Sequence, residues 1–97
     1  MRVFRKDANH GLVLHHIISL GWSALDLAQY GAPVDLAVCK GRAYALVEIK
    51  DGNKPPSARK ITKAGQKARD GWEGPYLVVT SPEDAEQQLH ELEKGIP

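Results

Sequence analysis

With 97 residues, the chain is long enough for one domain with a single modest core, so any functional site must be built on that core. Its formal net charge of +1 identifies no partner, and its single cysteine excludes an internal disulfide and a cysteine-based zinc site. No segment approaches the roughly 20 apolar residues of a membrane span, and no apolar stretch follows the basic N-terminus as in a signal peptide. These features predict a cytoplasmic protein with no membrane partner.

The first element is predicted to be a helix over residues 8–20, because its apolar residues recur at intervals of three and four. Asp7 or Asn9 is available as its N-cap, and Gly21 is expected to end it. Residues 22–28 alternate in part and are a candidate first strand.

Two strands are predicted more strongly, over residues 34–39 and 43–50, joined by a tight turn at Gly41. Both runs are almost wholly apolar, which is typical of strands covered on both faces. Cys39 ends the first run and is expected to be a small core residue.

The second half of the chain continues with a loop at 51–57, a helix capped by Thr62 that ends near Asp70, and an apolar strand over 76–80. Ser81 then begins a last helix, with proline and acidic residues in its first turn. The predicted order is αβββαβα, which indicates one three-layer α/β domain with a mixed sheet over residues 1–97.

The charges are distributed unevenly along the chain. Residues 40–69 contain nine basic and two acidic residues, whereas residues 80–97 contain five acidic residues and one lysine. This asymmetry favours a basic face that binds a polyanion and an acidic helix turned away from it. Two solvated faces of opposite sign are the alternative.

Three side chains in the two strong strands suggest catalytic chemistry. Glu48 and Lys50 are two positions apart in a predicted strand and therefore project to the same side, and Asp35 can meet them if the two strands are neighbours. Two carboxylates beside an ammonium group are what a Mg²⁺-dependent phosphodiester hydrolase needs. A salt bridge from Lys50 to either carboxylate that only fixes the strand register is the structural alternative.

The loop that follows is the expected contact with a phosphate backbone. Ser57 and Arg59 can donate to non-bridging phosphate oxygens, and Lys54 and Lys60 add attraction that does not depend on base sequence. An ordinary solvated loop is the alternative reading.

These motifs together resemble the PD-(D/E)XK nuclease superfamily. The resemblance is carried by Asp35, by the string Val-Glu-Ile-Lys-Asp-Gly at 47–52 and by Lys-Pro-Pro-Ser-Ala-Arg-Lys at 54–60. Within the superfamily the chain is most similar to the stand-alone, phage-type VRR-NUC nucleases, since Thr62 and Gln66 match a Thr-x-x-x-Gln pattern after the loop. The similarity runs from about residue 7 to residue 85 and implies a restriction-endonuclease-like αβββαβ core in a bacterial or phage-infected host cell.

The resemblance also implies roles for individual residues. Asp35 and Glu48 would bind Mg²⁺ or Mn²⁺ together with the backbone carbonyl of Ile49, Lys50 would assist the attacking water, and Gln66 would orient Lys50 or that water.

One feature of the chain departs from the family pattern, and at a second position the role of the residues is not decided by the pattern. Val34 separates Pro33 from Asp35, although proline supplies no ligand. In the first helix, where many relatives place an acidic or amide side chain near the metal, this chain has Asn9 and His10. Asn9 could support the metal ligands from behind or could only cap the helix.

The candidate metal ligands and the resemblance together predict a metal-dependent endodeoxyribonuclease, and the resemblance implies cleavage of branched DNA, such as four-way junctions or flaps, by a homodimer. The alternatives are a catalytically inactive nucleic-acid-binding module on the same fold, or an interaction module whose acidic C-terminal helix docks a partner protein.

Overall fold

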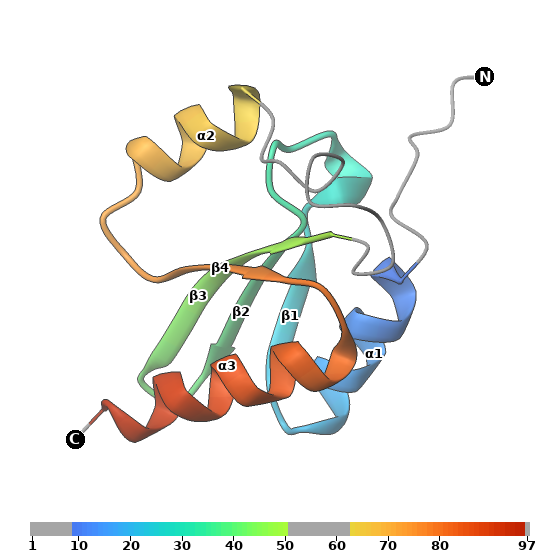
Figure 1. Cartoon of the computed structure of the whole chain (residues 1–97), viewed down its shortest axis with the longest axis vertical. Coiled ribbons are helices and arrows are strands. Elements are labelled where there is room, and N and C mark those ends of the chain that lie inside the picture. Colours follow the sequence, from blue (N-terminus) through green and yellow to red (C-terminus); the bar gives the residue numbers. More distant parts are fainter. Residues whose placement is uncertain (1–8, 51–62, 97) are drawn as a thin grey trace.

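The computed structural model describes residues 9–50 and 63–96, which form a mixed sheet flanked by helices (Figure 1). The elements in chain order are α1 (His10–Ser19), β1 (Ser23–Asp26), the 3-10 turn η1 (Ala28–Tyr30), β2 (Leu36–Lys40), β3 (Ala43–Ile49), α2 (Lys63–Asp70), β4 (Tyr76–Val79) and α3 (Pro82–Lys94). The strand order is β1-β2-β3-β4, with antiparallel pairs β1/β2 and β2/β3 and a parallel pair β3/β4. The predicted order of helices and strands and the mixed sheet are confirmed.

One face of the sheet carries the core, beneath α1 and α3. Alternate residues of the two central strands point to this face, where the helices cover them. The largest fully buried side chains are Ile17, Leu36, Ile49, Leu89, Val13, Val47 and Val79. Because full burial of one such side chain stabilises a fold by about 1.5–3 kcal/mol, this cluster is the main source of stability.

The opposite face of the sheet is only partly covered by the residues that the structure describes. Leu25, Tyr44 and Trp72 remain exposed large apolar residues, and together with their neighbours they line a shallow groove of about 450 Å³. The expectation that both strong strands have both faces covered is therefore wrong for this part of the chain. Cys39 is also exposed. Leu36 and Val38 take the core-facing positions of β2, so Ala37 and Cys39, which alternate with them, point to the opposite face.

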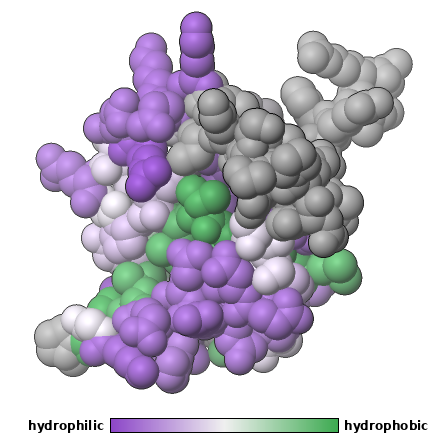
Figure 2. All heavy atoms as spheres, viewed as in Figure 1, coloured by the Kyte–Doolittle hydropathy of each residue, from purple (hydrophilic) through white to green (hydrophobic). Residues whose placement is uncertain are grey.

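The third layer is α2, which lies beyond the sheet face opposite to α3 (Figure 1). The guanidinium group of Arg69, in α2, lies over the ring of Tyr76 in β4, 5.6 Å from the ring centroid. Trp72, just after α2, packs edge-on against Tyr44 of β3. In the space-filling view, hydrophilic side chains cover both α2 and α3 (Figure 2).

The ends of the elements follow local rules in most cases. Gly21, which follows the C-cap residue Leu20 of α1, adopts a φ of +91°, and Gly41 a φ of +60° in the β2–β3 turn, both in the region that favours glycine. Ser81 caps α3 by accepting a hydrogen bond from the Asp84 N–H (3.0 Å). Asn9 occupies the N-cap position of α1, but its side chain makes no capping bond, so the capping role considered for Asn9 is wrong. Asp7 and Thr62, also expected to cap helices, lie outside the described residues.

No helix within residues 9–50 and 63–96 is long and apolar enough to cross a membrane.

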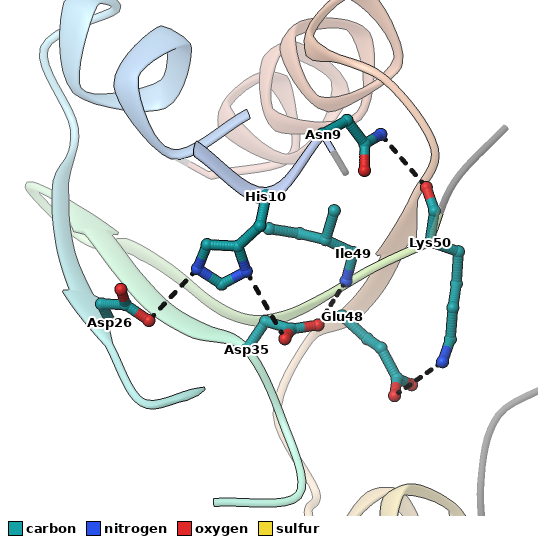
Figure 3. A network of polar contacts seen from close by, with 7 residues as sticks. All are labelled: Asn9, His10, Asp26, Asp35, Glu48, Ile49 and Lys50. Carbon is teal, nitrogen blue, oxygen red and sulfur yellow. Dashed lines mark hydrogen bonds and ion pairs between the residues drawn. The ribbon is translucent and has the colours of Figure 1, made fainter. Parts of the chain in front are cut away.

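The strand directions decide which residues meet. Since β3 and β4 are parallel, their C-terminal ends lie side by side, and antiparallel pairing brings the start of β2 and the end of β1 to the same end of the sheet. The N-terminus of α1 approaches this end as well (Figures 1 and 3). We refer to it below as the polar end of the sheet.

Candidate functional site

Asp35, Glu48 and Lys50 all lie at the polar end of the sheet (Figure 3). Leu36 pairs with Val47 across the β2–β3 ladder, so Asp35 comes just before the paired residues of β2 while Glu48 comes just after Val47 in β3. The prediction that Asp35 lies beside the strand that carries Glu48 depends on this β2–β3 register, which the structure shows.

Glu48 is the more buried of the two carboxylates, with a side chain only 4% exposed. Its Oε1 lies 3.6 Å from Lys50 Nζ, and its Oε2 accepts a hydrogen bond of 3.1 Å from the hydroxyl of Tyr76. A carboxylate removed from water to this degree is costly unless charged and hydrogen-bonding partners compensate it. Lys50, just after β3, and Tyr76, in β4, supply that compensation.

Tyr76 is a member of the site that the sequence prediction missed. Burial raises the pKa of its hydroxyl well above the usual value, and the negative charge of Glu48 and the hydrogen bond to it raise it further. Arg69 acts in the opposite direction on this pKa, and Asp35 adds a small upward contribution. The hydroxyl therefore stays protonated and serves as a hydrogen-bond donor to Glu48 near neutral pH.

Asp35 is held by the main chain of two segments. Its Oδ2 accepts a hydrogen bond of 2.7 Å from the Ile49 N–H, and its carbonyl oxygen accepts from the N–H groups of Leu27 (2.9 Å) and Ala28 (3.2 Å). The side chain is 25% exposed, in contrast to Glu48. Asp35 is therefore fixed in position and still reachable from solvent.

Asn9 joins the ends of the two parallel strands. Its Nδ2 donates to the carbonyl oxygen of Lys50 (3.2 Å) and to that of Thr80 (2.7 Å). Its Oδ1 is buried and has no hydrogen-bond partner among the described residues. Asn9 thus supports the main chain at Lys50 and Thr80, and these two side-chain hydrogen bonds go to neither of the predicted metal-binding carboxylates.

His10 brings a further buried group to the polar end. Its Nε2 lies 3.2 Å from Asp26 Oδ1, and its Nδ1 lies 3.6 Å from Asp35 Oδ1 (Figure 3). The sequence predicted that His10 lies near the site because it belongs to the first helix. It did not predict the contacts of His10 with Asp26 and Asp35, because these depend on how the helix packs against the folded sheet.

Of the remaining predicted site residues, one makes no hydrogen bond to Lys50, one contacts Asp35 through its main chain, and the others lie outside the described residues. Gln66 does not hydrogen-bond to Lys50: its side chain is exposed and donates to Asp70 Oδ1 (2.8 Å) on the same helix, because the two residues are one turn apart. Ile49 contributes its N–H to Asp35, as described above. The predicted phosphate-binding residues lie outside the described part of the chain; they are Lys54, Ser57, Arg59 and Lys60.

The donor set at the polar end suits a hard divalent cation of the Mg²⁺ type. Among the described residues, no three His, Cys, Asp or Glu side chains gather closely enough to hold a metal by themselves. Mg²⁺ commonly binds through one or two carboxylates and keeps several water ligands, so Asp35 and Glu48 are sufficient in number and type.

Comparisons with family models, with characterised proteins and with solved structures found no match for this chain.

Proposed function

We propose that this chain is a metal-dependent endonuclease that hydrolyses phosphodiester bonds in branched DNA. The observation that carries the proposal is the buried Glu48, paired at 3.6 Å with Lys50 at the same end of the sheet as Asp35. A charged pair at 4% and 15% exposure is a costly arrangement for a purely structural strand, since apolar residues would fill the same space without desolvation. Functional sites are where such arrangements are retained.

Asp35 and Glu48 are the residues that would hold Mg²⁺ or Mn²⁺. When bound, such an ion would supply an activated water and offset charge on the phosphate. The backbone carbonyl of Ile49 is a further candidate oxygen ligand, as the resemblance to PD-(D/E)XK nucleases implies.

Lys50 would act on the phosphate and on the attacking water. Glu48 Oε1 restrains its ammonium group, and Asn9 restrains its main chain through the Lys50 carbonyl, so both ends of the residue are fixed. A positive charge held in place before the substrate arrives costs no reorganisation when negative charge develops on the phosphate. Tyr76 keeps Glu48 oriented toward this site through its hydroxyl.

The DNA-binding surface would extend from the polar end over α2. Its side chains Lys63, Lys67 and Arg69 are exposed, and Arg69 lies over the ring of Tyr76 beside Glu48. Exposed lysine and arginine residues attract the phosphate backbone without reading bases, so recognition would depend on DNA shape. The acidic α3 lies on the other side of the sheet, away from this surface.

The test is cleavage of four substrates (a four-way junction, a flap, a duplex and a single strand) with Mg²⁺, with Mn²⁺ and with EDTA. We expect metal-dependent cutting of a branched substrate by the parent chain and loss of cutting in Lys50→Ala. The matched control is Lys94→Ala, which removes a lysine paired at 3.5 Å with Glu91 on the exposed side of α3. Equal cutting by Lys50→Ala and Lys94→Ala would exclude the proposed role of Lys50.

Two outcomes would instead favour the alternatives. Salt-sensitive DNA binding without cleavage would indicate a nucleic-acid-binding module. Failure to bind DNA in any form would favour an interaction module that acts through α3. The proposal also includes a homodimer, because two sites in one particle suit paired cuts in a junction; light scattering of the purified chain measures this directly.

A further inference from the structure

The side chain of His10 is buried at the polar end and has no part in the proposed hydrolysis. It is the first residue of α1, only 2% exposed, and it lies between the carboxylates of Asp26 and Asp35 (Figure 3). A buried imidazole between two carboxylates is an arrangement that core packing alone does not require, because an apolar side chain could fill the same volume.

The two ring nitrogens of His10 have different partners. Nε2 lies within hydrogen-bond distance of Asp26 Oδ1, at 3.2 Å, and an ionised carboxylate can only accept, so Nε2 carries a hydrogen. Nδ1 is buried and has no hydrogen bond among the described residues. It faces Asp35 Oδ1 at 3.6 Å, just outside hydrogen-bond range.

Asp35 is therefore restrained on both of its oxygens, but unequally. Oδ2 is held tightly by the Ile49 N–H at 2.7 Å, whereas Oδ1 faces the imidazole across the longer 3.6 Å separation. The imidazole beside Oδ1 limits how far the carboxylate can rotate. Groups that lie just outside the ligands of a metal commonly orient those ligands, and loss of one typically lowers metal affinity about 10- to 100-fold.

We propose that His10 is a positioning residue that, oriented by Asp26, sets the direction of the Asp35 carboxylate for cation binding. The inference rests on the proposed function, since it concerns the same metal site. It differs from a structural role in one measurable respect: a structural histidine affects the stability of the fold, whereas a positioning histidine also affects metal affinity in the folded chain.

Two substitutions separate the two sides of the imidazole. In His10→Gln the amide can reach the position of Nε2 and keep the contact with Asp26, but the ring nitrogen that faces Asp35 Oδ1 is removed. In His10→Asn the amide can take the position of Nδ1 opposite Asp35 and the contact with Asp26 is lost. His15→Gln is the matched control, because His15 is exposed on the same helix.

The experiment is titration of each folded chain with Mn²⁺, followed by electron paramagnetic resonance of the free ion, with circular dichroism to verify folding. We expect a loss of affinity of about 10-fold or more in His10→Gln, a smaller loss in His10→Asn and no change in His15→Gln. Asp35→Asn serves as the reference for loss of a ligand. Parent-like Mn²⁺ affinity in both folded His10 variants would overturn the inference and leave the proposed function standing.

A second measurement uses the unmodified chain, so it does not depend on the variants folding. Titration with Mg²⁺ is followed through the imidazole resonances of the four histidines. We expect the His10 resonances to shift with the same midpoint as Mg²⁺ binding. Binding of Mg²⁺ that leaves His10 unshifted would refute the positioning role, and absence of any Mg²⁺ or Mn²⁺ binding would refute the proposed function together with it.

Discussion

The hydrogen bond from Tyr76 to Glu48 offers the sharpest test of how the site is stabilised. Tyr76→Phe removes one hydroxyl and keeps the ring, so Arg69 retains its aromatic partner and no sizeable cavity forms. The substitution leaves Glu48 Oε2 without its 3.1 Å donor in a side chain that is only 4% exposed. The effect on stability is therefore the loss of one hydrogen bond to a buried charge.

The size of this loss follows from the partners that remain. Hydrogen bonds to charged groups contribute about 1.5–3 kcal/mol, and the Lys50 ammonium still compensates Oε1, so we expect a loss of about 2 kcal/mol in the free energy of unfolding. For a domain of this size, each kcal/mol lowers Tm by about 4–8 °C, so Tm should fall by about 10 °C.

Urea unfolding followed by far-ultraviolet circular dichroism measures this difference. The control is Tyr30→Phe, which removes a hydroxyl from a side chain that is 73% exposed and should change stability by less than about 0.5 kcal/mol. If Tyr76→Phe unfolds at the same urea concentration as Tyr30→Phe, the hydrogen bond to Glu48 does not contribute as argued.

The raised pKa of Tyr76 gives the same interaction a pH dependence of known sign. In the unfolded chain the phenol loses its proton near a pH of about 10, whereas in the folded chain burial and Glu48 keep it protonated to higher pH. Above about pH 10 the unfolded state binds fewer protons than the folded state, so this contribution to stability is present below that pH and is lost as pH rises. The stability difference between the parent and Tyr76→Phe should therefore be larger at pH 8 than at about pH 10.5 or above.

Three further substitutions test other contacts. Asn9→Ala removes the two hydrogen bonds from the Asn9 amide to the carbonyls of Lys50 and Thr80, which bridge the ends of the parallel strands, and should cost about 2 kcal/mol, with faster amide exchange in β4. An unchanged urea midpoint would contradict the bridging role. Ser81→Ala removes the cap bonded to Asp84 and should cost about 1 kcal/mol, whereas Ser81→Thr should restore most of it in the same unfolding assay. Gly74→Ala would place a Cβ 2.8 Å from the Trp72 ring, so that ring must move and tryptophan fluorescence should change; an unaltered emission spectrum would show that the ring is not packed there.

Local patterns predicted much of the fold correctly. The glycine at the turn and the two apolar runs around it fixed the β2–β3 hairpin, because hairpin pairing depends only on residues close in the chain. The same pairing placed Asp35 and Glu48 at one end of the sheet. Ser81 and the proline after it located the start of α3 to the residue, since capping is also local.

Other features depend on contacts between distant segments and were missed for that reason. Tyr76 meets Glu48 only through the parallel register of β3 and β4, which nothing in either strand specifies alone. The amide of Asn9 was considered as a cap but bonds to carbonyls 41 and 71 residues away. Cys39 was expected in the core because its whole run is apolar, although the two-residue period of a strand already points it away from Leu36 and Val38.

The bridge made by Asn9 has a consequence for when the site can exist during protein synthesis. Asn9 emerges early from the ribosome, but its stronger partner, the Thr80 carbonyl, is made 71 residues later. At a synthesis rate of about 5–20 residues per second, this interval lasts several seconds, during which α1 and the β2–β3 hairpin can form. Tyr76, the donor to Glu48 on β4, is also absent for most of that interval. A nascent chain therefore holds Glu48 without its Tyr76 donor and Asn9 without its Thr80 partner, and the polar end matures only when β4 docks.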